Sequence, residues 1–244
     1  MNIVVLTADE PLYLPAFFDR FLRARADDVR GIFVVRPRYG RDSTLTMVRR
    51  YTRAFGVANL LRLMWRTLRA KVCDRLGLGR SRGRFHSVAS AARAHGVPCE
   101  AVGNVNDPQF LDRLRALNVD LVVSVSCPQV FRRPLIELPP RGCLNVHGAL
   151  LPQYRGIAPS FWMMSRGETR AGVTVFLVNE DIDAGDVVEV QEFDILPGET
   201  LDQFITRSKR IHCDALLRAI ETVDRGPFEA RQLSKENGSY FSFP

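Results

Sequence analysis

The chain has 244 residues, of which 46% are apolar and 25% are charged. These proportions are ordinary for a soluble globular protein and exclude wholesale disorder or a collagen-like repeat. A chain of this length buries roughly 70% of its unfolded surface, so it folds without metals or disulfides. The five cysteines are odd in number and form no Cys-x-x-Cys pair, so we expect neither a metal site nor a secreted disulfide framework.

The net charge of +7 is spread unevenly along the chain. Twelve Arg or Lys and two acids lie between Arg41 and Ala92, so this segment carries +10 and the remaining residues sum to −3. Such a basic segment suggests an acidic partner: a phosphate, a nucleic acid or a membrane surface. Asp9 and Glu10 come too early for a signal peptide, and no apolar run reaches the ~18 residues of a spanning helix. We therefore expect a reduced, cytoplasmic protein.

Strands and helices alternate in the predicted order of elements. In chain order we expect a strand at 2–7, a helix at 12–25, a strand at 31–35, helices at 45–76 (broken near Gly56) and 87–95, a strand at 97–102, a helix at 108–117, and strands at 120–126 and 144–147. This alternation predicts a Rossmann-like α/β fold with a mostly parallel sheet flanked by helices. Strands at 172–178 and 186–193 follow with a short turn between them, which favours an antiparallel pair near the C-terminal end. A last helix is expected at 201–224.

We interpret residues 1–225 as one domain with a basic helical insert at about 41–84, followed by an aromatic tail at 226–244. The tail is irregular but contains Phe228, Tyr240, Phe241 and Phe243. We expect these rings to dock on the body of the domain, with a contact between two copies of the chain as the alternative.

Candidate chemistry lies in two polar sites that are far apart in the sequence. Asn145 and His147 end an apolar strand, and residues two apart on a strand point to the same face. Open α/β sheets place their ligands at the carboxyl ends of such strands. The second site is the acidic turn at 180–186, which contains Asp183.

An amide, an imidazole and a carboxylate together suit acyl transfer to an amine without a protein nucleophile. Asn145 can donate a hydrogen bond to a developing oxyanion, and His147 can donate another or exchange a proton. If Asp183 reaches the same pocket, it would hold the imidazole or favour its charged form.

At these residues the chain resembles the folate-dependent formyltransferases, a family that includes methionyl-tRNA, glycinamide ribonucleotide and sugar-nucleotide formyltransferases. The resemblance rests on LNVHGALLPQYRGIAP at 144–159, GET at 167–169, GVT at 172–174 and IDAGD at 182–186, in the family's order and at similar spacing. It covers about fifty residues. The four motifs together identify the family specifically, whereas any one of them alone would be weak evidence.

The resemblance implies 10-formyltetrahydrofolate as the formyl donor and a primary amine as the acceptor. Asn145, His147 and Asp183 match the family's catalytic residues: the first two would stabilise the oxyanion and Asp183 would support His147 and relay protons. The implied folate contacts are Val125, Ser126, Leu150, Leu151, Pro152, Glu180 and Ile182. The implied contacts to the acceptor are Tyr154, Arg155 and Gly156.

The acceptor is inferred by elimination. Methionyl-tRNA formyltransferases carry a further tRNA-contacting domain, which makes tRNA a less favoured partner of this chain. Glycinamide ribonucleotide formyltransferases have a glycine-rich phosphate loop after the first strand, where this chain has acids at Asp9 and Glu10. We therefore expect a small, phosphate-bearing amine, an amino sugar on a nucleotide or lipid carrier. A shortened methionyl-tRNA formyltransferase and a non-catalytic ligand-binding relative are the alternatives, and a homodimer stays open.

The basic insert contains an amphipathic helical pattern. Apolar side chains recur at Val57, Leu60, Leu61, Met64, Trp65, Leu68 and Val72, with basic side chains over much of the remainder. We expect the apolar stripe to pack on the body with the arginines solvated. The alternatives are peripheral contact with an anionic membrane or lipid-linked substrate, and contact with nucleotide or RNA phosphates.

Overall fold

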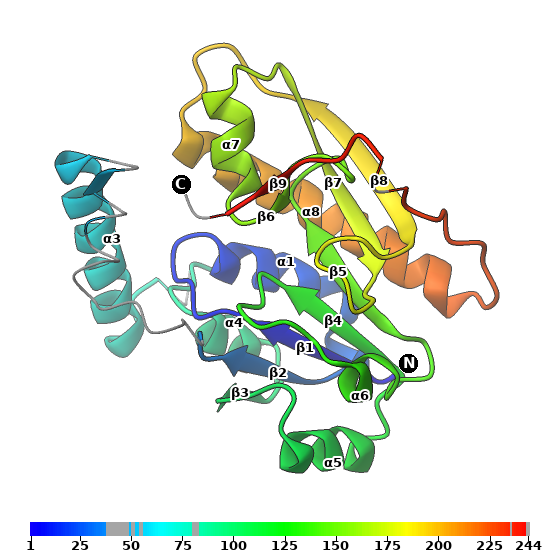
Figure 1. The fold of residues 1–244 in the computed structure, drawn as a ribbon. Coiled ribbons are helices and arrows are strands. Elements are labelled where there is room, and N and C mark those ends of the chain that lie inside the picture. Colours follow the sequence, from blue (N-terminus) through cyan, green and yellow to red (C-terminus); the bar gives the residue numbers. More distant parts are fainter. Residues whose placement is uncertain (38–48, 50–51, 54–55, 80–82, 235, 243–244) are drawn as a thin grey trace.

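The computed structural model describes residues 1–37, 49, 52–53, 56–79, 83–234 and 236–242. Seven strands form one sheet in the order β3-β2-β1-β4-β5-β7-β8 (Figure 1). The strands are β1 (Ile3–Thr7), β2 (Val29–Val35), β3 (Cys99–Val102), β4 (Leu121–Val125), β5 (Cys143–His147), β7 (Arg170–Leu177) and β8 (Val187–Asp194). The first five are parallel, whereas β7 is antiparallel to both β5 and β8. The predicted α/β class and the antiparallel pair are confirmed.

Helices cover both faces of this sheet. On one face α1 (Leu14–Arg25), α4 (Val88–Ala94) and α8 (Leu201–Asp224) pack over a core that includes Phe18, Phe21 and Leu216. On the other face α5 (Pro108–Ala116) and the short α6 (Arg133–Ile136) close a second core around Phe33 and Leu114. β1 and β4 are buried along their whole length, because both faces of a doubly covered sheet exclude water.

Local sequence explains where these helices begin. Ser87 and Thr200 form capping boxes with Ser90 and Gln203 at the start of α4 and α8. The predicted N-cap Asp107 accepts a hydrogen bond from the backbone of Gln109 at the start of α5. These capping contacts fix the first turns of α4, α5 and α8.

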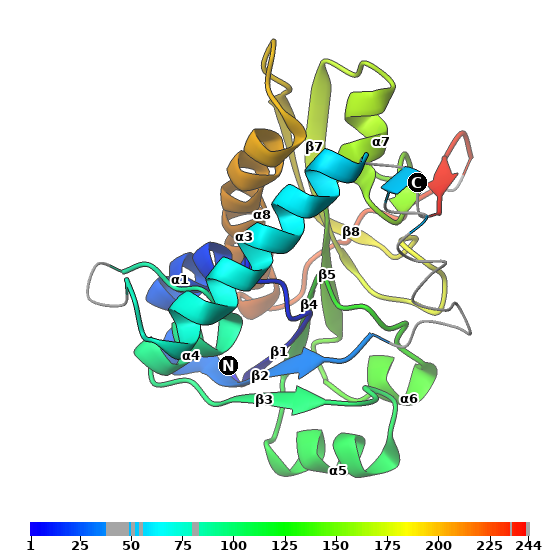
Figure 2. The ribbon, with the colours of Figure 1, turned by 90° about the vertical axis from the view of Figure 1, so that its left-hand side faces the viewer.

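Two elements lie outside this layered body. Helix α3 (Val57–Arg75) stands beside it (Figures 1 and 2), and the helix predicted from residue 45 to Gly56 falls mostly on residues outside those described. Helix α7 (Pro159–Ser165) follows β6 (Arg155–Gly156), which pairs in parallel with β9 (Tyr240–Phe241). The C-terminal tail therefore returns to a loop that leaves the carboxyl end of β5.

Candidate active site

Strand β5 places Asn145 and His147 at the change from parallel to antiparallel pairing. Their positions two residues apart give them the same face of the sheet. Across the antiparallel pair, Asn145 is in register with Phe176 and His147 with Thr174. His147 is buried and Asn145 is half-buried. Both therefore lie where a parallel sheet opens to ligands.

The ring of His147 is held from two sides. Its Nε2 lies 2.8 Å from the carbonyl oxygen of Tyr154. A carbonyl oxygen can only accept a hydrogen bond, so Nε2 carries the proton of that bond. Its Nδ1 lies 3.7 Å from Oδ2 of Asp183, beyond hydrogen-bond distance. A second proton, on Nδ1, would make the ring an imidazolium that faces the Asp183 carboxylate. Because that carboxylate is too far away to accept this proton in a hydrogen bond, the proton stays available to an oxygen of a bound ligand.

Asp183 is positioned by the loop that follows β5. Its Oδ2 accepts a 2.8 Å hydrogen bond from the backbone N–H of Gly156. Its own backbone is left-handed, with φ at 48°, and the side chain is 14% exposed. Tyr154 and Ala158, in the loop after β5, are also non-glycine residues with positive φ, as are Asn118, Ser126 and Asn237. Such backbone strain gathers at functional sites because the surrounding structure has to hold it in place.

The GVT segment of β7 holds the loop after β5 in place. The buried hydroxyl of Thr174 donates to the carbonyl of Ala149 at 2.7 Å and accepts from the N–H of Leu151 at 3.1 Å. A Cβ on Gly172 would lie 2.2 Å from Cδ2 of Leu150, so a larger residue there would displace the Leu150 side chain. Leu151 and Pro152 are joined by a cis peptide bond. These contacts give structural reasons for residues that the sequence showed only as a motif.

Residues 237–242, which we call the C-terminal strap, lie against the same loop. Ser239 accepts from the N–H of Arg155 at 2.9 Å, and its hydroxyl accepts from the N–H of Tyr154 at 2.8 Å. Phe241 accepts from the N–H of Ile157 at 2.9 Å. A Cβ on Gly156, whose φ is 96°, would lie 2.2 Å from the Phe241 carbonyl oxygen. The strap thus fixes the segment that contacts both His147 and Asp183.

Aromatic packing completes this attachment. The ring of Phe241 is stacked between Tyr154 and Trp162, with centroids 5.3 Å and 5.0 Å away. The guanidinium of Arg166 lies 4.7 Å from the centre of the Phe241 ring, a cation–π contact. This part of the tail docks on the body, as the sequence predicted.

The residues assigned to folate contact differ in exposure. Ser126, Glu180 and Ile182 are exposed, and Leu150 and Pro152 are half-buried. The side chains of Val125 and Leu151 are buried, and Val125 belongs to the core with Val146. Only the main chain of these two residues remains for a ligand. Leu150 and Ile182 are the apolar side chains of this set that are not fully buried.

The residues assigned to the acceptor have different surroundings. The Nε nitrogen of half-buried Arg155 is shielded from solvent and has no hydrogen-bond partner within the described part of the chain. Tyr154 donates its hydroxyl proton to Glu168, and burial and this bond raise its pKa to about 12. Gly156 has no side chain, and its backbone N–H donates to Asp183. Of the three, Arg155 alone offers a charged side chain for an anionic group.

Helix α8 contributes two residues that sequence patterns did not single out. Nδ1 of the buried His212 donates to the Ser208 carbonyl at 2.6 Å, and its Nε2 lies against Gly148. Burial lowers the pKa of His212 to about 3, and the charges of Lys209 and His147 add to the effect. Lys209 donates to the hydroxyl of Ser126 at 3.2 Å. The sequence gives no sign of these contacts, because they form only when α8 packs with His212 against the loop after β5 and with Lys209 against the residue after β4.

The loop after β1 is closed to external anions. The side chain of Glu10 accepts hydrogen bonds from the backbone N–H groups of Leu12, Tyr13 and Leu14, at 2.7, 2.8 and 3.1 Å. A helix N-terminus that would otherwise attract a phosphate is therefore capped by the chain's own carboxylate. Of the two acids expected to disfavour a phosphate loop here, Glu10 has this capping role.

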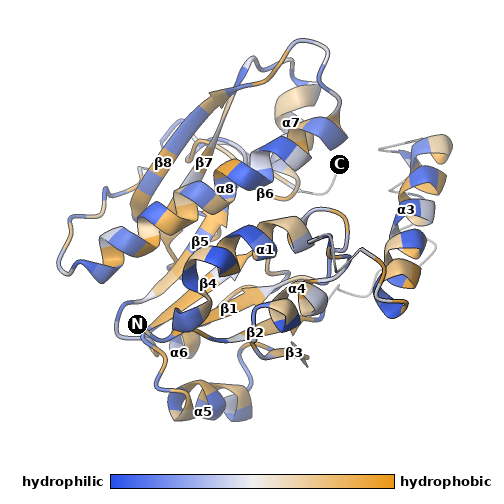
Figure 3. Ribbon diagram, turned by 180° about the vertical axis from the view of Figure 1, so that it is seen from behind, coloured by the Kyte–Doolittle hydropathy of each residue, from blue (hydrophilic) through white to orange (hydrophobic). Residues whose placement is uncertain are grey.

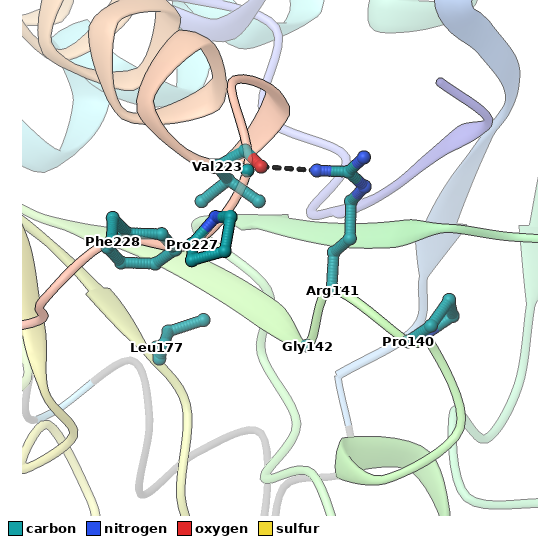
Figure 4. A pocket seen from close by; sticks show the side chains of 8 residues that line it. Pro140, Arg141, Gly142, Leu177, Val223, Pro227 and Phe228 are labelled. Carbon is teal, nitrogen blue, oxygen red and sulfur yellow. Dashed lines mark hydrogen bonds between the residues drawn. The ribbon is translucent and has the colours of Figure 1, made fainter.

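A pocket of 440 Å³ lies at the opposite end of β5 (Figure 4). Gly142, which precedes the strand, and Leu177 line it, and the nearby Arg141 donates a hydrogen bond to the Val223 carbonyl. The guanidinium of Arg141 therefore already has a hydrogen-bond partner at the C-terminal end of α8. We assign no chemistry to this pocket.

A model of the family described as formyl transferase matches residues 74–220. The chain belongs to this family. The match includes Asn145, His147 and Asp183, and it begins near the C-terminal end of α3, so most of the basic insert lies outside it. The family resemblance expected from the motifs is confirmed.

Curated relatives are methionyl-tRNA formyltransferases. The protein from Syntrophus aciditrophicus is 36% identical over 162 residues, which are 62% of this chain and 52% of the relative. The protein from Clostridioides difficile is 29% identical over 164 residues, or 67% of this chain and 53% of the relative. The chain thus spans about half the length of the curated relatives it matches.

Solved structures share the fold at low identity. Glycinamide ribonucleotide transformylase 1 from Symbiobacterium toebii has a TM-score of 0.63 at 18% identity, covering 96% of this chain and 92% of its own. A sugar N-formyltransferase from a Shewanella species has 0.60 at 19% identity, covering 99% and 76%. A sugar 3N-formyltransferase determined with dTDP and 5-N-formyl-THF has 0.60 at 16% identity, covering 99% and 69%.

The described residues contain neither a metal-binding cluster nor a membrane-spanning helix. No group of three or more His, Cys, Asp or Glu side chains among them could hold a metal ion. None of the helices formed by these residues is both long and apolar enough to cross a bilayer.

Proposed function

We propose that this protein transfers a formyl group from 10-formyltetrahydrofolate to the primary amine of a small molecule, an amino sugar on a nucleotide or lipid carrier. The formyl transferase family uses this folate as its donor. The observation that carries the proposal is the convergence at one strand end: β5 supplies Asn145 and His147, and a distant turn brings Asp183 within 3.7 Å of the imidazole.

Each of these residues has a role that follows from its contacts. When bound, 10-formyltetrahydrofolate supplies the electrophilic carbon. The Asn145 amide donates a hydrogen bond to the oxygen on that carbon as negative charge develops. His147, oriented by the Tyr154 carbonyl, holds a proton at Nδ1 for the same oxygen or for the departing nitrogen. Asp183, held by the Gly156 N–H, stabilises the charged imidazole and accepts the proton that the amine loses, directly or through water.

Two features support a phosphate-bearing small molecule as the acceptor. Glu10 caps the amides after β1, so a phosphate has to be bound elsewhere. Arg155 lies one residue before Gly156 and has a buried nitrogen without a partner in the described part of the structure. A guanidinium there can pair with a phosphate in bidentate fashion, close to the reacting groups. The relative solved with dTDP is a sugar formyltransferase, which makes nucleoside-diphosphate amino sugars the first acceptors to examine.

The test is a screen of acceptors with 10-formyltetrahydrofolate and purified protein, in which release of tetrahydrofolate is recorded. The panel contains nucleoside-diphosphate amino sugars, free amino sugars, amino acids and charged initiator tRNA. A chain carrying both Asn145→Ala and His147→Ala serves as the blank. We expect turnover with an amino-sugar nucleotide that is absent from the blank. Turnover with none of the sugars contradicts the proposed acceptor, and equal turnover by the blank contradicts the proposed site.

The second candidate acceptor is methionyl-tRNA, favoured by the 36% identity to a methionyl-tRNA formyltransferase. That match covers 52% of the relative, so about half of the relative's length lies outside it. The charged tRNA in the panel decides this point. Formylation of the methionyl-tRNA at a rate above that of every sugar would favour the second candidate.

A further inference from the structure

Helix α3 exposes its most apolar side chains to solvent instead of burying them. The exposed stripe consists of Val57, Leu61, Met64, Trp65, Leu68, Val72 and Leu76, which follow one another at helical spacing and are 45–66% exposed. Figure 3 shows this apolar colouring on a helix that stands beside the body. The expectation that the apolar stripe packs on the body is therefore wrong.

The reason lies on the opposite side of the helix. The less exposed residues are Leu60, Leu63, Arg66, Thr67, Ala70, Cys73 and Asp74, and only Ala70 is fully buried. Arg66 is paired with Asp202 of α8 at 2.6 Å, and Tyr13 donates its hydroxyl proton to the same Asp202 oxygen at 2.6 Å. The first contact ties α3 to α8, and the second holds the same carboxylate from the residue before α1, so the exposed stripe is turned outward.

Basic side chains border the exposed stripe. Arg62, Arg69, Lys71 and Arg75 are exposed, and the helix has one acid, Asp74, which belongs to the less exposed side. An apolar stripe bordered by cations fits an interface that is apolar within and anionic at its surface. The long arginine and lysine side chains can reach headgroups while the stripe enters the acyl region.

We propose that α3 binds peripherally to an anionic membrane surface. The exposed stripe enters the acyl–headgroup boundary, with Trp65 at its centre, and the bordering cations contact anionic headgroups. A second copy of the chain is a poorer occupant, because pairing two such helices would bring their exposed cations together without exposed acids on the helix to offset them. RNA is a poorer occupant because phosphate contact leaves the apolar stripe in water. The inference concerns binding alone and does not depend on the proposed activity.

Sedimentation with vesicles tests the proposal on the full chain. We expect binding to vesicles of phosphatidylcholine mixed with phosphatidylglycerol, weaker binding at high salt, and little binding to phosphatidylcholine alone. The variant with Trp65→Ser and Leu68→Ser should bind on the order of 100-fold more weakly, because two large apolar side chains no longer enter the bilayer. Replacing Arg69 and Lys71 by Ser should cost about fivefold for each cation.

A matched control removes exposed apolar side chains elsewhere. Val130 and Leu196 are 59% and 51% exposed and lie outside α3, so Val130→Ser with Leu196→Ser should leave vesicle binding unchanged. The chain has two tryptophans, and Trp162→Phe leaves Trp65 as the reporter. Its emission should shift to shorter wavelength when anionic vesicles are added, because the indole moves out of water.

Three results would overturn the proposal. The first is no sedimentation with anionic vesicles at low salt, and the second is equal binding by the Trp65→Ser, Leu68→Ser variant. The third comes from light scattering: if that variant converts a dimer into a monomer while vesicle binding is unaffected, the exposed stripe is an interface between copies. Thermal melting of each variant verifies that the fold is intact.

Discussion

The loop after β5 and helix α3 are both strongly patterned in the sequence, yet their residues act in opposite ways. Around the loop, several motif residues have a partner within the chain: Thr174 of β7 bonds to Ala149, and Gly156 bonds to Asp183. In α3 the strongest pattern, the exposed stripe, has solvent on its outer side. A pattern that is satisfied internally defines a site in this molecule, whereas a pattern left exposed indicates a partner outside it.

The largest effect is expected in the loop region. Asn145→Ala removes a hydrogen bond to the developing oxyanion, so the rate of formyl transfer to the best acceptor should fall on the order of 100- to 1,000-fold. The half-buried position tolerates a smaller side chain, so folding and folate binding should change little. Steady-state kinetics, with folate affinity measured in parallel, separate the two quantities. A loss confined to folate affinity would remove Asn145 from the chemistry.

Much of this site could be predicted from sequence because its residues are close along the chain or belong to a known motif. Asn145 and His147 need only the two-residue period of a strand to share a face. Their approach to Asp183 came from the family resemblance, since no local pattern connects residues 36 positions apart. The contribution of Ser239 and the burial of His212 depend on tertiary packing, which carries no local signal.

The failure at α3 has a similar physical cause. Periodicity showed the helix and its apolar stripe correctly, but it does not say which side meets the body. The side was decided by Arg66, Asp202 and Tyr13, which lie far apart in the sequence. Amphipathic spacing alone therefore predicted the helix correctly but led to the wrong side of it facing the body.

The next prediction concerns the strap. In Gly156→Ala the new methyl group would lie 2.2 Å from the Phe241 carbonyl at a φ of 96°, so β9 has to leave β6. We expect a loss of about 2 to 4 kcal/mol in unfolding free energy, with lower activity because Asp183 loses its anchor. Gly167→Ala is the control: its φ of 72° is also left-handed, but its Cβ would meet nothing within 4 Å. It should cost about 1 kcal/mol. Urea unfolding measures the unfolding free energy of both glycine variants.

The same measurement at two pH values tests the effect of His212 on stability. Burial lowers the pKa of folded His212 from its ordinary value of 6.5 to about 3, so protonation favours the unfolded chain. The stability is fully present above pH 6.5 and is lost as the pH falls through the range between these two values. We expect a loss of about 2 kcal/mol at pH 5 from this group. His212→Gln should remove that part of the pH dependence, whereas His86→Gln should keep it.

The smallest effect is expected in α3. Trp65→Ser with Leu68→Ser should change the unfolding free energy by less than about 0.5 kcal/mol per site, since both side chains are more than half exposed. By contrast, Phe18→Ala in the core should cost about 3 to 5 kcal/mol. A large loss from the α3 variant would mean that the exposed stripe is buried in solution, and it would remove the difference between the two regions.

The most direct test of the account is the single-turnover rate of formyl transfer in His147→Ala, with the folate donor prebound and His86→Ala as the control. We expect a loss on the order of 100- to 10,000-fold for His147→Ala, with folate affinity kept and the control unchanged. Transfer by His147→Ala at the rate of the unmodified protein would contradict it.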